Sequence, residues 1–230
     1  MNRLAVTGIQ AVTFDVGGTL IEPWPSVGDL YAETAEAVLG ERFAPALLNE
    51  RFVTAWREAH RLPGGFNYTQ DDWAGVVRQT FTGLTPRAGE AELFRALWTR
   101  FTEPEAWHVF PDVRPCLETL AASGVRLAVL SNWDERLGPL LERLGLTRHF
   151  EVVVVSVEAG THKPSPAIFT HAARLIGLPP AALLHVGDSA REDFEGARAC
   201  GWSSLLLRRG TASENAISSL AELPGRLGIS

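Results

Sequence analysis

The feature that most constrains this chain is a series of short apolar segments, each ending near a polar residue. These segments are Gly8–Val16, Val125–Leu130, Val152–Val157, Leu183–Val186 and Ser204–Leu207. Continuous apolar runs rich in β-branched residues favour strands of a parallel sheet that is covered on both faces. Helical patterns lie between the later strands, at Val113–Ser123, Glu135–Leu144 and Pro166–Ile176, and each is followed by a glycine typical of helix ends. The alternation predicts an α/β fold with a Rossmann-like parallel sheet built from right-handed βαβ units.

The segment from residue 22 to residue 108 has a different pattern and interrupts the series after its first strand. It contains no convincing strand and holds five of the seven tryptophans. Apolar residues recur at helical spacing in Tyr31–Leu39, Pro45–His60, Asp72–Phe81 and Ala91–Phe101. Prolines at 23, 25, 104 and 111 mark the two junctions. We therefore predict an all-helical domain at 22–108, inserted into a core made of residues 1–21 and 109–230.

Composition excludes several classes of protein. The net charge of -6, from 27 acidic and 21 basic residues, is not the basic footprint of a nucleic-acid-binding protein. No apolar run reaches the roughly 18–20 residues that span a bilayer, and no signal peptide is recognisable. The cysteines, Cys116 and Cys200, form neither a disulfide framework nor a metal cluster. We expect a cytoplasmic protein that acts on a small molecule and binds neither nucleic acid nor membrane, whereas its oligomeric state cannot be read from the sequence.

Candidate chemistry begins at the end of the first predicted strand, in the segment Asp15-Val16-Gly17-Gly18-Thr19-Leu20. A carboxylate that leaves a buried strand can serve as a nucleophile or as a metal ligand. The two glycines let backbone atoms approach a ligand closely. An ordinary Asp-Gly-Gly turn explains this segment about equally well when it is taken alone.

Three further strand ends carry polar residues, and ligands bind at this edge in open parallel sheets. Ser131 and Asn132 suit a phosphate oxygen, although they are also common helix-cap residues. Lys163 is the only lysine, so every other basic residue among the 21 is arginine. A site that needs a compact point charge cannot accept an arginine fork, although a lone loop lysine is usually a solvated charge. Asp188 and Asp193 offer hard oxygen ligands suited to Mg²⁺. Asp193 has a second explanation, since a negative charge in the first turn of a helix stabilises that helix.

Taken in this order, the four segments resemble the haloacid dehalogenase (HAD) superfamily, and the helical insert resembles the C1 cap of its subfamily I. The resemblance implies that Asp15 is the nucleophile. It implies a Mg²⁺ site formed by Asp15, the backbone carbonyl of Gly17, and Asp188. The remaining implied roles concern the transferred group and its charge: phosphate binding by Ser131, Asn132, Thr19 and Gly18, charge pairing by Lys163, and orientation of Lys163 or of a metal-bound water by Asp193.

The chain departs from the phosphatases of this family at Gly17, where they usually carry a second Asp as general acid and base. That group typically contributes about 10²–10⁴-fold to the rate. Three interpretations follow. The protein is a Mg²⁺-dependent phosphatase of a small phosphorylated metabolite, which favours good leaving groups or takes a proton elsewhere, for instance from Glu22. Alternatively it is a metal-independent 2-haloacid dehalogenase-like hydrolase, or a low-activity or non-catalytic module that binds a phosphorylated ligand.

The first interpretation is favoured because the lysine and the metal ligands are all present. The dehalogenases carry Tyr where this chain has Gly17, and they lack the acidic motif of Gly187 and Asp188. A phosphonatase is rejected, because residues 22–110 contain no lysine to form a Schiff base. For substrate contact within the insert, we single out Trp24, Arg57, His60 and Arg61, each of which more often serves packing or a solvated face.

Overall fold

A six-stranded sheet organises the core of the protein, which a computed structural model describes at residues 8–61, 65–84, 89–211 and 216–229. Its strands are β1 (Ala11–Phe14), β4 (Arg126–Ser131), β5 (Val152–Val155), β6 (Leu183–Gly187), β7 (Ser203–Leu207) and β8 (Ala216–Ile217). They lie in the order β5-β4-β1-β6-β7-β8, and every neighbouring pair is parallel. The chain builds outward from β1 in one direction and then in the other. Strand order therefore reverses at β1, where open α/β sheets bind their ligands.

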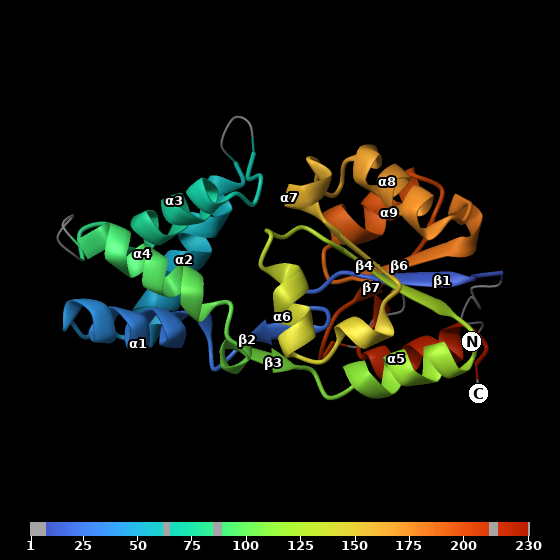
Figure 1. Ribbon diagram of the computed structural model, residues 1–230, viewed down its shortest axis with the longest axis horizontal. Coiled ribbons are helices and arrows are strands. Elements are labelled where there is room, and N and C mark those ends of the chain that lie inside the picture. The colour runs from blue at the N-terminus through green and yellow to red at the C-terminus, as the bar shows by residue number, and fades with distance from the viewer. Residues whose placement is uncertain (1–7, 62–64, 85–88, 212–215, 230) are drawn as a thin grey trace. The chain divides into compact units, whose positions relative to one another are not determined.

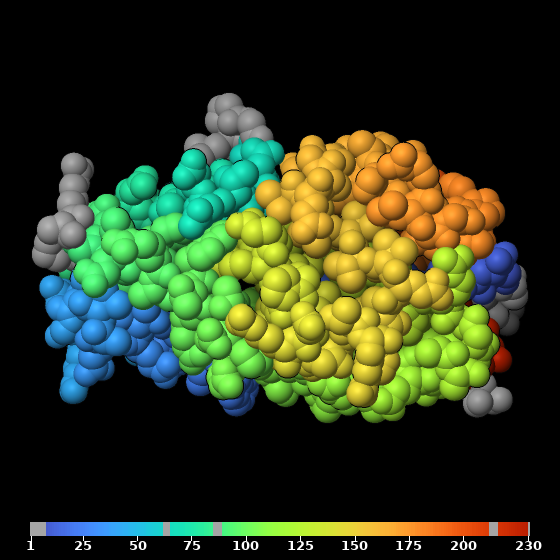
Figure 2. Space-filling model, in the orientation of Figure 1, coloured from blue at the N-terminus to red at the C-terminus, as the bar shows by residue number. Residues whose placement is uncertain are grey.

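Helices cover both faces of this sheet, as the predicted α/β fold requires (Figure 1). They are α5 (Val113–Ala122), α6 (Leu137–Arg143), α7 (Ser156–Ala159), α8 (Pro166–Ile176), α9 (Gly196–Ala199) and α10 (Leu223–Arg226). The buried face of α8 presents Ile168, Phe169, Ala172 and Ile176 to strand residues that include Ala11 and Leu130. The segments coloured yellow to orange in Figure 2 cover most of β1 on the face shown. Short 3-10 turns lie at Pro104–Ala106, Thr147–His149, Pro180–Ala182 and Leu220–Glu222.

The sequence places the ends of helices more accurately than those of strands. Gly124, Gly145 and Gly177 all have the positive φ that ends a helix. The predicted strand over Val152–Val157 is wrong at its end, because α7 begins at Ser156. The Ser156 hydroxyl accepts a hydrogen bond from the Trp133 amide (3.0 Å) and donates one to the Trp133 carbonyl (2.9 Å), which draws this residue out of the ladder.

The chain forms two compact units by its internal contacts. The core unit contains Met1–Ile21 and Val109–Ser230, and the helical unit contains Glu22–His108. The helical unit consists of α1 (Val27–Leu39), α2 (Pro45–Ala59), α3 (Gln70–Phe81) and α4 (Glu90–Arg100). The expectation that this segment holds no strand is wrong at its two ends. There, β2 (Ile21–Pro23) and β3 (Trp107–Val109) pair in a two-stranded sheet. Strands this short carry no apolar alternation that a sequence could reveal.

Aromatic side chains form the interior of the helical unit. One cluster centres on Tyr31, whose ring stacks on Phe81 at 5.8 Å between centroids. A second cluster buries Phe66 and Tyr68 against the partly buried Trp56. Such rings remove a large apolar area from water, so a helical unit of this size can hold its own core. Among the described helices of the chain, none has both the length and the apolar character needed to cross a membrane.

Candidate active site

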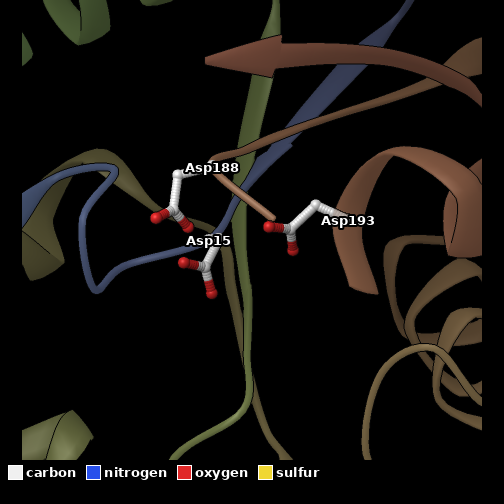
Figure 3. Close-up of side chains that lie close together, drawn as sticks. All are labelled: Asp15, Asp188 and Asp193. Carbon is white, nitrogen blue, oxygen red and sulfur yellow. The ribbon is translucent and has the colours of Figure 1, made fainter. Parts of the chain in front are cut away.

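Three carboxylates converge at the carboxyl edge of the sheet (Figure 3). Asp15 follows β1, Asp188 follows β6, and Asp193 lies in a short π-helix over Ala190–Glu195. Because β1 and β6 are adjacent and parallel, with Phe14 opposite Val186, their ends meet at one edge. One carboxylate oxygen of each residue lies within 4.8 Å of the others. The fold thus brings together acidic residues from distant segments, since Asp15 and Asp188 are 173 positions apart in the sequence.

Lys163 lies in the same cluster and is almost completely buried, with 1% of its surface exposed. Its Nζ lies 2.8 Å from Asp15 Oδ1 and 2.5 Å from Asp193 Oδ1. The alternative of a solvated surface lysine is therefore wrong. A compact ammonium between two carboxylates matches the exclusion of arginine from this position, because a planar fork needs more room and other geometry.

Ser131 and Asn132, at the end of β4, contact the cluster in different ways. The Ser131 hydroxyl donates to Asp15 Oδ1 at 3.0 Å. The Asn132 side chain holds the backbone of Lys163, since its Oδ1 accepts the Lys163 amide (2.7 Å) and its Nδ2 donates to the Lys163 carbonyl (2.9 Å). Nδ2 also donates to Glu192 at 3.2 Å. The sequence predicts phosphate binding by Asn132 but does not reveal this clamp, because the partner of its side chain lies 31 positions away.

Asp193 is held by hydrogen bonds to both of its oxygens. Besides the ammonium, Oδ1 faces Nε2 of His185 at 3.0 Å, and Oδ2 accepts the Ser189 amide at 2.8 Å. A Cβ added to Gly187 would lie 2.2 Å from Asp193 Cγ, so the carboxylate needs a glycine beneath it. His185 was not among the residues predicted for the site, although a histidine inside the apolar strand Leu183–Gly187 is a usable signal.

Three carboxylates share one ammonium in this cluster, and burial together with mutual repulsion disfavours the charged form of two of them, Asp15 and Asp188. Burial lowers the pKa of Lys163, but the charges of Asp15 and Asp193 raise it above its ordinary value. Burial raises the pKa of Asp15 despite the nearby Lys163. For Asp193, the effect of burial is outweighed by Lys163 and His185, which bring its pKa below the ordinary range. Burial, followed by the charges of Asp15 and Asp193, raises the pKa of Asp188 to about 7.

This charge pattern fits a divalent cation held by oxygen ligands. The oxygens of Asp193 are engaged by Lys163, His185 and Ser189, so Asp193 is poorly suited to be a direct ligand. Asp15 Oδ2 accepts no hydrogen bond from any described residue. Asp188 lies directly against the glycine loop, since a Cβ on Gly18 would meet its Oδ2 at 2.5 Å. Two carboxylates beside an open backbone loop are hard donors of the kind that Mg²⁺ prefers.

Thr19 differs from the other predicted phosphate-binding residues, because its side chain is fully buried. Among the described residues its Oγ1 has no hydrogen-bond partner. Its backbone carbonyl accepts Arg209 Nη2 at 2.6 Å, and Arg209 also pairs with Asp112 at 3.0 Å and covers the ring of Phe110. The structure thus anchors the loop after β1 through the Thr19 backbone, and phosphate binding by its hydroxyl stays a prediction.

The indole of Trp133 lies against the position where a second acid is missing. A Cβ added to Gly17 would lie 3.3 Å from Trp133 Cζ3, closer than ordinary van der Waals contact. The Trp133 backbone is fixed from both sides by the Ser156 hydroxyl. Glu22, the proton donor suggested from the sequence, lies in the helical unit, where it contacts His108 at 3.3 Å.

The candidates singled out in the insert have unlike surroundings. The His60 ring packs on Trp56 at 4.1 Å and on Phe66 at 4.8 Å, as part of the second aromatic cluster. The Trp24 side chain is 53% exposed and its ring contacts His108 at 5.3 Å. His60 therefore serves packing within the helical unit.

Comparison with known proteins adds a second line of argument. The sequence pattern of the haloacid dehalogenase-like hydrolases matches residues 9–201. The chain is 33% identical over 234 residues to haloacid dehalogenase-like hydrolase domain-containing protein 3 of Danio rerio, covering 95% of this chain and 96% of that protein. It is 32% identical over 228 residues to phosphoglycolate phosphatase of Chromobacterium violaceum, covering 94% and 95%. A solved HAD phosphatase from Thermococcus onnurineus is similar with a TM-score of 0.70 and 25% identity, covering 96% of this chain and 98% of that chain.

Proposed function

The chain belongs to the haloacid dehalogenase-like hydrolase family, and from this premise we propose that it is a Mg²⁺-dependent phosphatase of small phosphorylated metabolites. The observation that carries the proposal is the pair Asp15 and Asp188, whose negative charge Lys163 alone does not balance. A phosphatase must bring a carboxylate to an anionic phosphate, and this requires more positive charge than one lysine. The similarity to a phosphoglycolate phosphatase supports the same substrate class.

In this proposal Asp15 is the nucleophile. Lys163 and Ser131 both donate to its Oδ1, which fixes the carboxylate and leaves Oδ2 without a partner among the described residues. A carboxylate oxygen attacks phosphorus, the bond from phosphorus to the leaving oxygen breaks, and an aspartyl-phosphate forms. Water then attacks this phosphorus, inorganic phosphate leaves, and the Asp15 carboxylate is restored.

Asp15, Asp188 and the backbone carbonyl of Gly17 would hold the metal. When bound, Mg²⁺ offsets negative charge on the phosphoryl oxygens and on the carboxylates. Lys163 shares this task at Asp15, while Asp193 holds the ammonium in place. Ser131 and the amide of Asn132 would contact the transferred phosphoryl group, together with the backbone of Gly18.

The leaving group is where this site should differ from related phosphatases. Gly17 offers no acid to protonate a departing alkoxide, and the Trp133 indole lies beside it. The reaction should therefore favour substrates whose leaving oxygen is already weakly basic, such as acyl and aryl phosphates. In the same proposal, the helical unit over 22–108 is the C1 cap, inserted into a HAD core of residues 1–21 and 109–230.

A panel of phosphate esters tests the proposal. Acetyl phosphate, p-nitrophenyl phosphate and phosphoglycolate are offered with Mg²⁺ and with EDTA, beside the variant Asp15→Asn. We expect phosphate release that needs Mg²⁺, disappears in Asp15→Asn, and rises steeply as the leaving group becomes less basic.

The same assay separates the alternatives. Halide release from 2-chloropropionate in EDTA would favour the dehalogenase interpretation. Binding of a phosphate mimic without turnover of any ester would favour a non-catalytic module. Either result would contradict a Mg²⁺-dependent phosphatase.

A further inference from the structure

We propose that His185 is a positioning residue, which as a neutral imidazole donates its Nε2 hydrogen to Asp193 and so sets how Lys163 is shared with Asp15. This inference rests on the proposed function for its catalytic consequence. Its structural part concerns the resting protein and can be tested without a substrate.

His185 is a polar side chain in a buried position, so its ring nitrogens need hydrogen-bond partners. Its side chain is fully buried at the centre of the sheet, on β6 opposite Thr13 of β1. An apolar ring packs against it: the centroids of the His185 and Phe169 rings are 5.9 Å apart, and the two rings are nearly perpendicular. An imidazole nitrogen left without a partner in this dry environment would destabilise the fold, so both nitrogens need partners.

The hydrogen-bond partners assign the tautomer. Nε2 faces Asp193 Oδ1 at 3.0 Å, and a carboxylate that already accepts Lys163 and Ser189 can only accept here too. Nε2 therefore carries the hydrogen. Nδ1 lies 2.8 Å from the Thr13 hydroxyl, whereas the other acceptor of that hydroxyl, the Leu184 carbonyl, is at 3.4 Å. The shorter contact makes Thr13 the donor to Nδ1, which completes a neutral ring.

Surrounding charge is consistent with this neutral form. Burial lowers the pKa of His185, and the hydrogen bond from His185 to Asp193 opposes the shift without removing it. The adjacent Lys163 ammonium also disfavours a second positive charge. The other charged groups facing the ring are Asp193 and Asp15, and both are already engaged by Lys163.

The consequence concerns the balance of Lys163 between its two carboxylates. One oxygen of Asp193 accepts from both Lys163 and His185, so the imidazole withdraws part of the charge that would otherwise attract the ammonium. Without this donor, Asp193 should bind the ammonium more strongly, at the expense of Asp15. His185 would then act on the nucleophile through two intermediates, Asp193 and Lys163, without touching the substrate.

The single lysine makes a direct test possible. Protein labelled with ¹⁵N-lysine gives one side-chain ammonium signal, that of Lys163. The variants are His185→Phe, which keeps a ring and removes the donor, and His185→Gln, whose amide nitrogen replaces Nε2. His171→Phe, on the partly exposed face of α8, is the matched control.

We expect imidazole ¹⁵N spectra of the wild type to show the neutral Nε2–H form at neutral pH. His185→Phe should shift the Lys163 ammonium signal and lower kcat about 10- to 100-fold, the usual range for a residue that orients a reacting group, with little change in KM. His185→Gln should recover most of both readouts, and His171→Phe should match the wild type.

An Nδ1–H form or an imidazolium in the wild type would overturn the proposal, even if the variants do not fold. So would an unchanged ammonium signal and kcat in His185→Phe. If the wild type releases no phosphate from any ester, the proposed function fails, and the two NMR readouts still decide whether His185 sets the position of Lys163.

Discussion

Each unit of the molecule packs a histidine against its interior, fully buried His185 in the core unit and partly buried His60 in the helical unit, and the two surroundings differ. In the core unit, His185 lies in a chain of hydrogen bonds from Thr13 to Asp193 and Lys163. In the helical unit, His60 lies among the rings of Trp56 and Phe66. The core unit therefore buries charge, whereas the helical unit buries aromatic area.

This difference follows from how each unit is built. Parallel strands bring the ends of distant segments to one edge, so a buried charge can meet an opposite charge there. Packed helices offer a wide lateral surface, which large rings cover efficiently. A change in the charged cluster should therefore be felt mainly in activity, and a change in the aromatic clusters mainly in stability. The predictions below test this division, starting with the largest effect.

Loss of the nucleophile should have the largest effect. Asp15→Asn should lower kcat by more than about 10⁴-fold, because a neutral amide cannot form the covalent intermediate. Circular dichroism and the unfolding temperature should show a folded protein, since Lys163 keeps Asp193 as a partner. Substantial turnover by this variant would show that Asp15 is not the nucleophile.

Replacement of the single lysine comes next. Lys163→Arg should lower kcat about 10²- to 10⁴-fold, because the larger planar fork cannot sit between the two carboxylates in this buried space. The matched control is Arg126→Lys, at an exposed pair where Arg126 contacts Glu151 at 2.7 Å. That change should leave kcat as it is and alter stability by less than about 1 kcal/mol. An unaltered rate in Lys163→Arg would remove Lys163 from the mechanism.

A pair of glycines compares the two units directly. In Gly187→Ala the new Cβ would lie 2.2 Å from Asp193 Cγ, so the carboxylate must move. We expect kcat to fall about 10- to 100-fold and the free energy of unfolding to fall by about 1–3 kcal/mol. In Gly75→Ala, inside α3, nothing lies within 4 Å of the new Cβ. The free energy of unfolding of that variant should rise by about 0.5–1 kcal/mol, and its kcat should not change. A loss of activity in Gly75→Ala would contradict the assignment of activity to the core unit.

The pH dependence of metal binding is the smallest predicted effect. Because the pKa of Asp188 is raised to about 7, protons compete with Mg²⁺ below that pH. Calorimetry should find that Mg²⁺ affinity falls up to about tenfold for each pH unit below 7.

The same carboxylate also predicts a stability profile for the metal-free protein. A folded-state pKa above the ordinary value of Asp means that the protonated folded form is favoured. Its stabilising contribution is present below pH 4 and is lost as the pH rises through about 7. Asp188→Asn should remove this dependence, and an unchanged stability profile in the variant would contradict it.

Much of the core could be predicted from the sequence, because buried parallel strands are continuous apolar runs and their polar ends stand out. Asp15, Ser131 and Asp188 were found for this reason. Lys163 stood out because it is the only lysine. A strand pattern and a residue type are enough to predict these positions, and their partners in the fold need not be known.

The features that the sequence did not reveal all depend on partners far along the chain. The Asn132 clamp on the Lys163 backbone, the contact of His185 with Asp193, and the contact between Arg209 and Thr19 are examples. Each residue alone has an ordinary explanation as a cap, a core side chain or a surface charge. Only the fold shows which partner each residue meets. The strands β2 and β3 are likewise too short to recognise in the sequence and can be identified only because they pair with each other.

The most direct test of the central claim is to trap the covalent intermediate. The protein is mixed with acetyl phosphate and Mg²⁺, quenched in acid within milliseconds, treated with borohydride and digested for mass spectrometry. We expect the reduced phosphorylation site to be Asp15, and the same peptide should stay unmodified in EDTA. Phosphate release that proceeds with no modification of Asp15, or with the modification on another residue, would contradict it.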